Sequence, residues 1–83
     1  MEHNTILLTM QYGSIKLKLK ELMTEQGISR YKLARSINTR FEVVNKWYNG
    51  NVEKIDLDVL ARICYVLNCK IEDILVYSPP ENS

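Results

Sequence analysis

Apolar residues recur at helical spacing over most of this chain, in stretches separated by residues that favour helix ends. Leu19, Leu22 and Met23 lie three and four positions apart, which is typical of one face of an α-helix. Gly27 follows them, and glycine readily takes the left-handed conformation that ends a helix. The pattern therefore predicts a helix over about residues 18–26.

The same spacing predicts four further helices, over about residues 30–37, 40–49, 57–67 and 71–75. Short polar residues stand at their boundaries: Ser29 and Asp56 are candidate N-caps, and Asn38 and Asn68 are candidate turn residues. We expect the apolar residues at helical spacing to face one core. They are Leu19, Leu22, Met23, Leu33, Ala34, Ile37, Val44, Trp47, Leu57, Leu60, Ile63, Cys64 and Leu67.

The beginning of the chain has the character of a strand. Residues 5–10 are rich in β formers, Gly13-Ser14 is a turn signal, and residues 15–19 alternate strictly between apolar and polar. We expect a short strand that ends near Leu17. Its partner stays open between two alternatives: residues 75–77 of the same chain, or the strand of a second chain, because an unpaired strand edge invites pairing.

The 83 residues predict one all-α domain of five helices with a candidate short N-terminal β segment. The domain is expected over residues 14–77, after an N-terminal extension over residues 1–13 that is partly β-like or mobile. Residues 78–83 have nothing to bury and are expected to form a disordered tail. A chain of this length has room for one core, but not for a core plus a deep substrate cleft.

Several classes of function are disfavoured. No apolar run approaches the ~20 residues that span a bilayer, and no signal peptide is recognisable, so we expect a cytoplasmic protein without a membrane partner. Cys64 and Cys69 have no histidine near them and do not supply four zinc ligands, so we expect reduced thiols, no metal and no cofactor. Without a glycine-rich phosphate loop, a nucleophile motif or paired carboxylates, we expect no enzyme.

The net charge of +1 hides an asymmetry along the chain. Residues 16–46 contain eight basic and three acidic side chains, whereas residues 47–83 contain three basic and six acidic ones. A molecule with one basic part is suited to a polyanion, although a run of charge is also what any solvated face shows.

The segment 28–50 carries the functional hypothesis, because it predicts a helix, a very short turn, a second helix and a glycine stop. Steep crossing of such a pair leaves one face of the second helix exposed. Its side chains suit the major groove: Arg and Lys donate to guanine, Asn binds adenine, and Glu accepts from cytosine. The alternative is that a polar outer face is simply what any surface helix shows. The outward residues are Arg40, Phe41, Glu42, Asn45, Lys46 and Asn49.

Four stretches resemble a known family. They read GISRYKLA at 27–34, TRFEVVNKWYNG at 39–50, IDLDVLARIC at 55–64 and LNC at 67–69. In order and spacing they closely resemble the Cro/lambda-repressor-like helix-turn-helix family, the xenobiotic-response-element type of transcriptional regulator, in a minimal single-domain branch. The resemblance runs from about residue 19 to residue 75. It implies a five-helix lambda-repressor-like DNA-binding domain.

The resemblance also implies roles for individual residues. It places Arg30 and Asn49 at phosphate-contacting positions, and Lys54 in a loop that often meets the DNA backbone. The positions that face bases and flanking phosphates are Arg40, Phe41, Glu42 and Lys46, with Asn45 between them. Three features depart from the family pattern: Asn38 replaces the usual turn glycine, Tyr48 stands where Glu is common, and Phe41-Glu42 is an unusual pair for a groove.

Together, the residues and the resemblance predict a sequence-specific regulator of transcription that binds double-stranded DNA, reads the major groove with the helix at about 40–49, and acts as a repressor. A homodimer is expected, because one module of this size covers little DNA. The alternative function is an antitoxin or a protein-interaction module with the same fold, whose partner would be a toxin or another protein.

Overall fold

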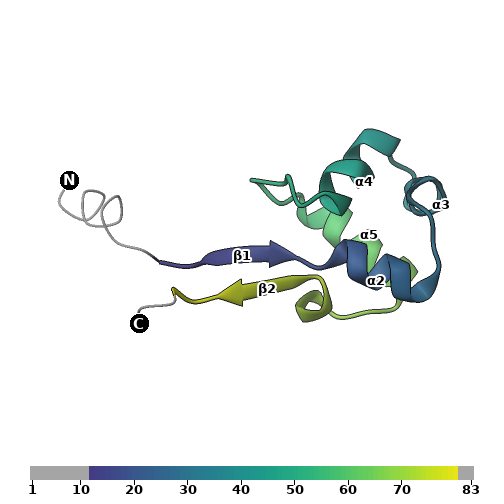
Figure 1. The fold of residues 1–83 in the computed structure, drawn as a ribbon. Coiled ribbons are helices and arrows are strands. Elements are labelled where there is room, and N and C mark those ends of the chain that lie inside the picture. Colours follow the sequence, from purple (N-terminus) through teal and green to yellow (C-terminus); the bar gives the residue numbers. More distant parts are fainter. Residues whose placement is uncertain (1–11, 81–83) are drawn as a thin grey trace.

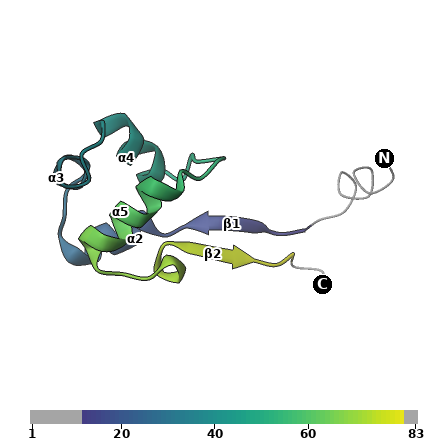
Figure 2. The same cartoon turned by 180° about the vertical axis from the view of Figure 1, so that it is seen from behind.

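The computed structural model describes residues 12–80 and arranges them as a cluster of helices from which a two-stranded arm extends (Figures 1 and 2). The described elements are β1 (Ser14–Leu17), α2 (Leu19–Gln26), α3 (Arg30–Ser36), α4 (Phe41–Tyr48), α5 (Leu57–Leu67), the 3₁₀ turn η1 (Ile71–Asp73) and β2 (Leu75–Ser78). The predicted β character of residues 5–10 lies outside the described residues.

The helix ends follow from local side-chain chemistry. The hydroxyl of Ser29 accepts a hydrogen bond from the backbone N–H of Lys32 at 3.1 Å, and so caps α3. A carboxylate oxygen of Asp56 accepts from two N–H groups in the first turn of α5, at 2.9 and 3.2 Å. Gly27 and Asn68 take left-handed conformations, with φ of 69° and 51°, directly after α2 and α5. These four boundaries confirm the sequence prediction.

The first strand has its partner in the same chain. β1 pairs antiparallel with β2, with Ile15 opposite Tyr77 and Leu17 opposite Leu75. The alternative with residues 75–77 of the same chain is therefore the one that the structure contains. Gly13, at φ +84°, precedes the ladder, and a Cβ atom there would collide with the carbonyl oxygen of Ser78. A glycine is needed where the two backbones meet this closely.

One apolar core lies within the helix cluster. The buried residues are Leu19, Met23, Leu33, Ala34, Ile37, Val44, Trp47, Leu60, Ile63, Leu67 and Ile74. All but Ile74 were expected to face inward. The prediction for Leu57 was wrong, because this side chain is 75% exposed. Leu57 is the first residue of α5 and is not among the apolar residues packed against the core. The start of α5 therefore extends beyond the edge of the core.

The predicted fold class was right in part: the domain is mostly helical and its β segment pairs with residues 75–78, but the described residues form four α-helices and a two-stranded sheet rather than an all-α fold of five helices. The expected helix over 71–75 is only the turn η1, whose N–H groups bond three residues back, from Asp73 to Lys70 and from Ile74 to Ile71. The carbonyl of Ile74 then accepts from the N–H of Lys18 at 2.7 Å. This contact directs the chain into β2. None of the described helices has the length and apolar character needed to cross a membrane.

Candidate nucleic-acid interface

The turn between α3 and α4 is closed by backbone hydrogen bonds around Asn38. Asn38 has φ 57°, its N–H donates to the carbonyl of Arg35 at 3.1 Å, and the N–H of Thr39 donates to the carbonyl of Ala34 at 3.0 Å. This pair of bonds around a left-handed residue is a Schellman motif. Asparagine tolerates that conformation better than most residues with a Cβ, so it can stand at a turn position where glycine is common. The prediction of Asn38 as the turn residue is confirmed.

A side chain from α5 braces the same turn. Nη1 of Arg62 donates to the carbonyl oxygen of Ile37 at 2.8 Å, directly before Asn38. Nη2 of the same guanidinium lies 2.9 Å from a carboxylate oxygen of Asp58, one turn earlier in α5. Sequence reasoning missed Arg62. Only its spacing of four from Asp58 was visible in the sequence, and that spacing indicates the ion pair but not the contact with Ile37.

The outer face of α4 is polar and accessible. Four of the residues predicted to contact DNA are exposed there: Arg40, Glu42, Lys46 and Asn49. Arg40 is the N-cap residue and the other three follow at helical spacing. The opposite face of α4 is held by Val44 and Trp47, both buried. Lys54 is also exposed, in the loop that follows α4.

The other three predicted residues, Arg30, Phe41 and Asn45, lie half-buried where α3 meets α4. Nη1 of Arg30 donates to Oδ1 of Asn45 at 2.7 Å. The guanidinium carbon of Arg30 lies 5.7 Å from the ring centroid of Phe41 and 4.6 Å from that of Tyr48. The structure therefore places Arg30 between two aromatic rings of α4 and gives it a role between the helices that the sequence did not predict.

Phe41 and Tyr48 make further contacts with side chains of α3 and α2. The rings of Tyr31 and Phe41 stack with centroids 4.4 Å apart and an interplanar angle of 26°. Nζ of Lys20, on α2, lies 5.7 Å from the ring centroid of Tyr48. Each cation over a ring face contributes on the order of 0.5–1 kcal/mol at a partly exposed site. The unusual residues Phe41 and Tyr48 thus have a packing role, which is to hold α4 against α2 and α3.

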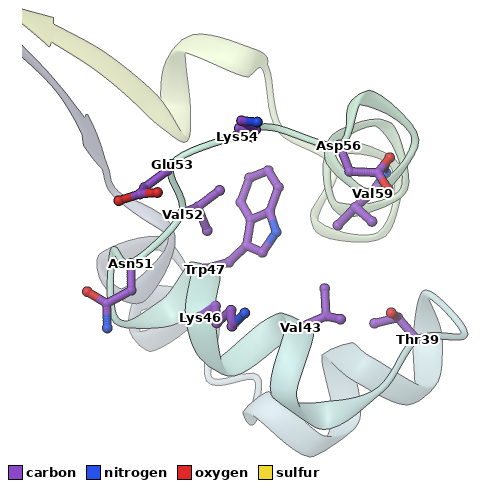
Figure 3. A pocket seen from close by; sticks show the side chains of 10 residues that line it. All are labelled: Thr39, Val43, Lys46, Trp47, Asn51, Val52, Glu53, Lys54, Asp56 and Val59. Atoms are coloured by element: carbon purple, nitrogen blue, oxygen red, sulfur yellow. Dashed lines mark hydrogen bonds between the residues drawn. The ribbon is translucent and has the colours of Figure 1, made fainter.

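An open hollow of about 470 Å³ is lined by residues of α4, among them Val43 and Trp47, and by the loop that follows this helix (Figure 3). The indole of Trp47 points into it from α4, and Lys46 and Lys54 stand at its border. Glu53 and Asp56 also line it, so the hollow concentrates neither sign of charge. Within residues 12–80, no three His, Cys, Asp or Glu side chains gather in a way that could hold a metal ion.

The family model described as the Cro/C1-type HTH DNA-binding domain matches residues 18–80, from just before α2 to just after β2. The chain belongs to this family. None of the curated proteins compared matches the sequence significantly.

Solved structures agree with the assignment to the Cro/C1-type family. The transcriptional regulator VanUg is 25% identical, with a TM-score of 0.66, and the match covers 87% of this chain and 95% of that one. A candidate DNA-binding protein from Bacteroides fragilis is 16% identical, with a TM-score of 0.68, and the match covers 76% of this chain and all of that one. At 16% identity the second likeness shows the fold alone. The chain thus carries a helix-turn-helix DNA-binding domain, as its sequence indicated.

The two cysteines of this Cro/C1-type domain lie at the end of α5. Cys69 donates its backbone N–H to the carbonyl of Cys64 at 3.1 Å, in the turn around Asn68. Burial, and then the neighbouring Cys64 thiol, raise the pKa of Cys69 to about 11. Both thiols are free. A thiol with a raised pKa is a poor nucleophile near neutral pH.

Proposed function

We propose that this Cro/C1-type domain is a repressor of transcription that binds one sequence of double-stranded DNA and reads its major groove with α4 and the flanking residues 40 and 49. The observation that carries the proposal is the two-sided character of α4. Its inner face is buried through Val44 and Trp47, and its outer face presents polar side chains to solvent. A recognition helix needs one face packed firmly on the core and another face that the major groove can reach.

The exposed side chains are expected to contact bases, phosphates or, for Arg40, either of the two. Lys46 donates to guanine O6 and N7, and Glu42 accepts from the amino group of cytosine or adenine, so these two distinguish base pairs. Arg40, at the start of the helix, reaches either a base or a flanking phosphate. Asn49 and Lys54 lie at the far end and in the next loop, where they meet the phosphate backbone. Contacts to phosphate position the protein, and contacts to bases give it specificity.

Binding will also have a large non-specific part. Lys32 and Arg35 are exposed on α3, the first helix of the helix-turn-helix. If about four to six phosphates are neutralised per protomer, log K should fall against log salt with a slope of about −4 to −5. A flat response to salt would contradict the proposal.

The test compares three single variants of the full chain on a panel of labelled duplexes by fluorescence anisotropy. Lys46→Ala and Arg40→Ala should each weaken specific binding by about 1–3 kcal/mol, and Lys46→Ala should relax preference at one base pair. Lys16→Ala is the matched control, because it removes an exposed lysine from β1. Equal losses in all three variants would show that α4 is not the reading helix.

We also propose that the working unit is a homodimer in the cytoplasm. One module of this size buries only ~600–1,000 Å² of its own surface on DNA, so a long operator needs two copies. α5 offers an apolar surface for protein contacts, since Leu57 and Tyr65 are 75% and 87% exposed and lie eight residues apart on that helix. Tyr65→Lys should lower the mass measured by sedimentation if this surface joins two copies. An unchanged dimer would exclude it.

The same apolar surface supports one alternative function, a protein-interaction module such as an antitoxin. In that case α5 would bind a toxin or another protein. Co-purification of a stoichiometric partner, lost in Tyr65→Lys and kept in Lys46→Ala, would favour this alternative. If no stoichiometric partner co-purifies with the unsubstituted chain and Lys46→Ala loses DNA binding, the repressor is favoured.

A further inference from the structure

The orientation of the Asn45 amide on α4 is determined by its partner. Nη1 of Arg30 lies 2.7 Å from Oδ1 of Asn45. A guanidinium has only donors, so the atom that faces it must be the amide oxygen. The amide NH₂ of Asn45 is therefore the end left for another partner. A bond in which the donor is charged is about twice as strong as a neutral one, so this orientation persists.

Arg30 is itself held in place. Its guanidinium carbon lies 4.6 Å from the ring centroid of Tyr48 and 5.7 Å from that of Phe41, and Phe41 stacks on Tyr31 in turn. Arg30 is also half-buried. Contacts of this kind restrict the rotamers of a long side chain before any ligand binds. The Arg30–Asn45 pair is thus a preorganised unit that joins the start of α3 to the middle of α4.

Asn45 occupies the position where this pair meets the exposed face of α4. Its helical neighbours Glu42, Lys46 and Asn49 are exposed, and Asn45 is half-buried among them. An unrestrained asparagine reads adenine in the major groove with both ends of its amide. The oxygen accepts from the adenine amino group, and the NH₂ donates to N7. That arrangement needs a free oxygen.

In this structure the oxygen already accepts from a cation. An adenine amino group brought to it would also approach the positive charge of Arg30, which repels a donor. Guanine instead presents two acceptors, N7 and O6, and no donor on that part of its major-groove edge. The NH₂ of Asn45 can donate to both, and the nearby guanidinium charge favours the approach of O6.

We propose that Arg30 is a specificity-determining residue, which by holding Oδ1 of Asn45 makes this asparagine select guanine over adenine at the base pair that it faces. The proposal rests on the proposed function, since it requires α4 to read a duplex. It replaces the phosphate contact expected for Arg30 from its sequence position with a role inside the recognition unit.

The experiment uses the full chain and duplexes of its preferred site that carry G·C or A·T, in either orientation, at each position in turn. Asn45→Ala locates the base pair, as the position where discrimination disappears. There the unsubstituted protein should prefer guanine by about tenfold in Kd, the order expected for one good bidentate contact. Arg30→Met, which removes the charge and the donors at similar length, should lose this preference and shift it towards adenine.

Arg30→Lys is the matched variant, because it keeps a charge and a donor and should retain the guanine preference in part. The side-chain amide resonances of Asn45 provide a readout without DNA, and they should move in Arg30→Met far more than in Lys16→Ala. If Arg30→Met weakens all duplexes equally and reduces the salt slope by about one, Arg30 contacts phosphate and the proposal is overturned. Preference for adenine by the unsubstituted protein also overturns it, and leaves the proposed function standing. Absence of any preferred duplex refutes both.

Discussion

Replacement of Arg62 by methionine should loosen the turn that joins the two helices of the DNA-binding unit. Methionine keeps the length and apolar stem of the side chain but removes its charge and donors. The variant loses the hydrogen bond from Nη1 to the carbonyl of Ile37 and the ion pair with Asp58. The core lies on the other face of α5, with Leu60 and Ile63, and is left intact.

The two losses differ in size. A hydrogen bond from a charged group to a backbone carbonyl contributes about 1.5–3 kcal/mol, and partial exposure reduces this figure, since the Arg62 side chain is 46% exposed. The carboxylate of Asp58 is 69% exposed, so the ion pair contributes only about 0.2–0.5 kcal/mol. We therefore expect Arg62→Met to lower the free energy of unfolding by about 1–2 kcal/mol. For a domain of this size that corresponds to a fall in Tm of roughly 5–10 °C.

The assay is reversible thermal and urea unfolding followed by circular dichroism. Asp58→Asn is the matched control, because it breaks the same ion pair and keeps the bond to Ile37. Loss of the ion pair and of a negative charge in the first turn of α5 should cost about 0.5 kcal/mol. Equal destabilisation by the two variants would show that the hydrogen bond from Arg62 to the turn contributes nothing.

Three further predictions concern single positions. Asp56→Ala removes the cap of α5 and should lower the free energy of unfolding by about 1 kcal/mol in urea titrations; no change would contradict the capping role. Gly13→Ala should speed amide hydrogen exchange in both strands, because the added Cβ would collide with the backbone of Ser78. In Gly27→Ala the added Cβ meets open space, so the variant should only lower the free energy of unfolding by about 1 kcal/mol, for the left-handed φ. Equal exchange rates of the strand amides in the two variants would contradict this prediction. Because burial raises the pKa of Cys69 to about 11, iodoacetamide should label this thiol slowly at pH 8–9, and labelling at the rate of a free thiol would contradict the prediction. The contribution of Cys69 to the free energy of unfolding should be complete below about pH 9 and fall as pH rises to about 11, because the unfolded chain loses the proton first.

Local chemistry made most of the helical fold predictable. Ser29 and Asp56 cap helices with groups two or three residues away, and Gly27 ends a helix by its own conformational freedom. The periodicity of apolar residues located the core for the same reason, since it is a property of one helix at a time. Leu57 shows the limit of periodicity, because it continues the apolar face of α5 beyond the point where the core ends.

Long-range contacts account for the errors. Residues 71–75 read as a helix, but the bond from Lys18 to the carbonyl of Ile74 comes from a residue more than fifty positions earlier. Pairing of β1 with β2 has the same origin, so the sequence left two partners open. The candidate site divides in the same way. The exposed face of α4 could be predicted, because it follows from the helical spacing of the apolar residues in that helix. The contacts of Arg30 with Asn45, and of Arg62 with Ile37, span 15 and 25 residues and leave no periodic trace.

Selection from a randomised duplex library will show whether α4 reads a specific duplex. The full chain is incubated with the library at moderate salt, and the bound duplexes are sequenced over several rounds. We expect enrichment of one motif, which is lost when Arg40 and Lys46 on the exposed face of α4 are both changed to alanine. Enrichment of no motif, or of the same motif by the double variant, would contradict it.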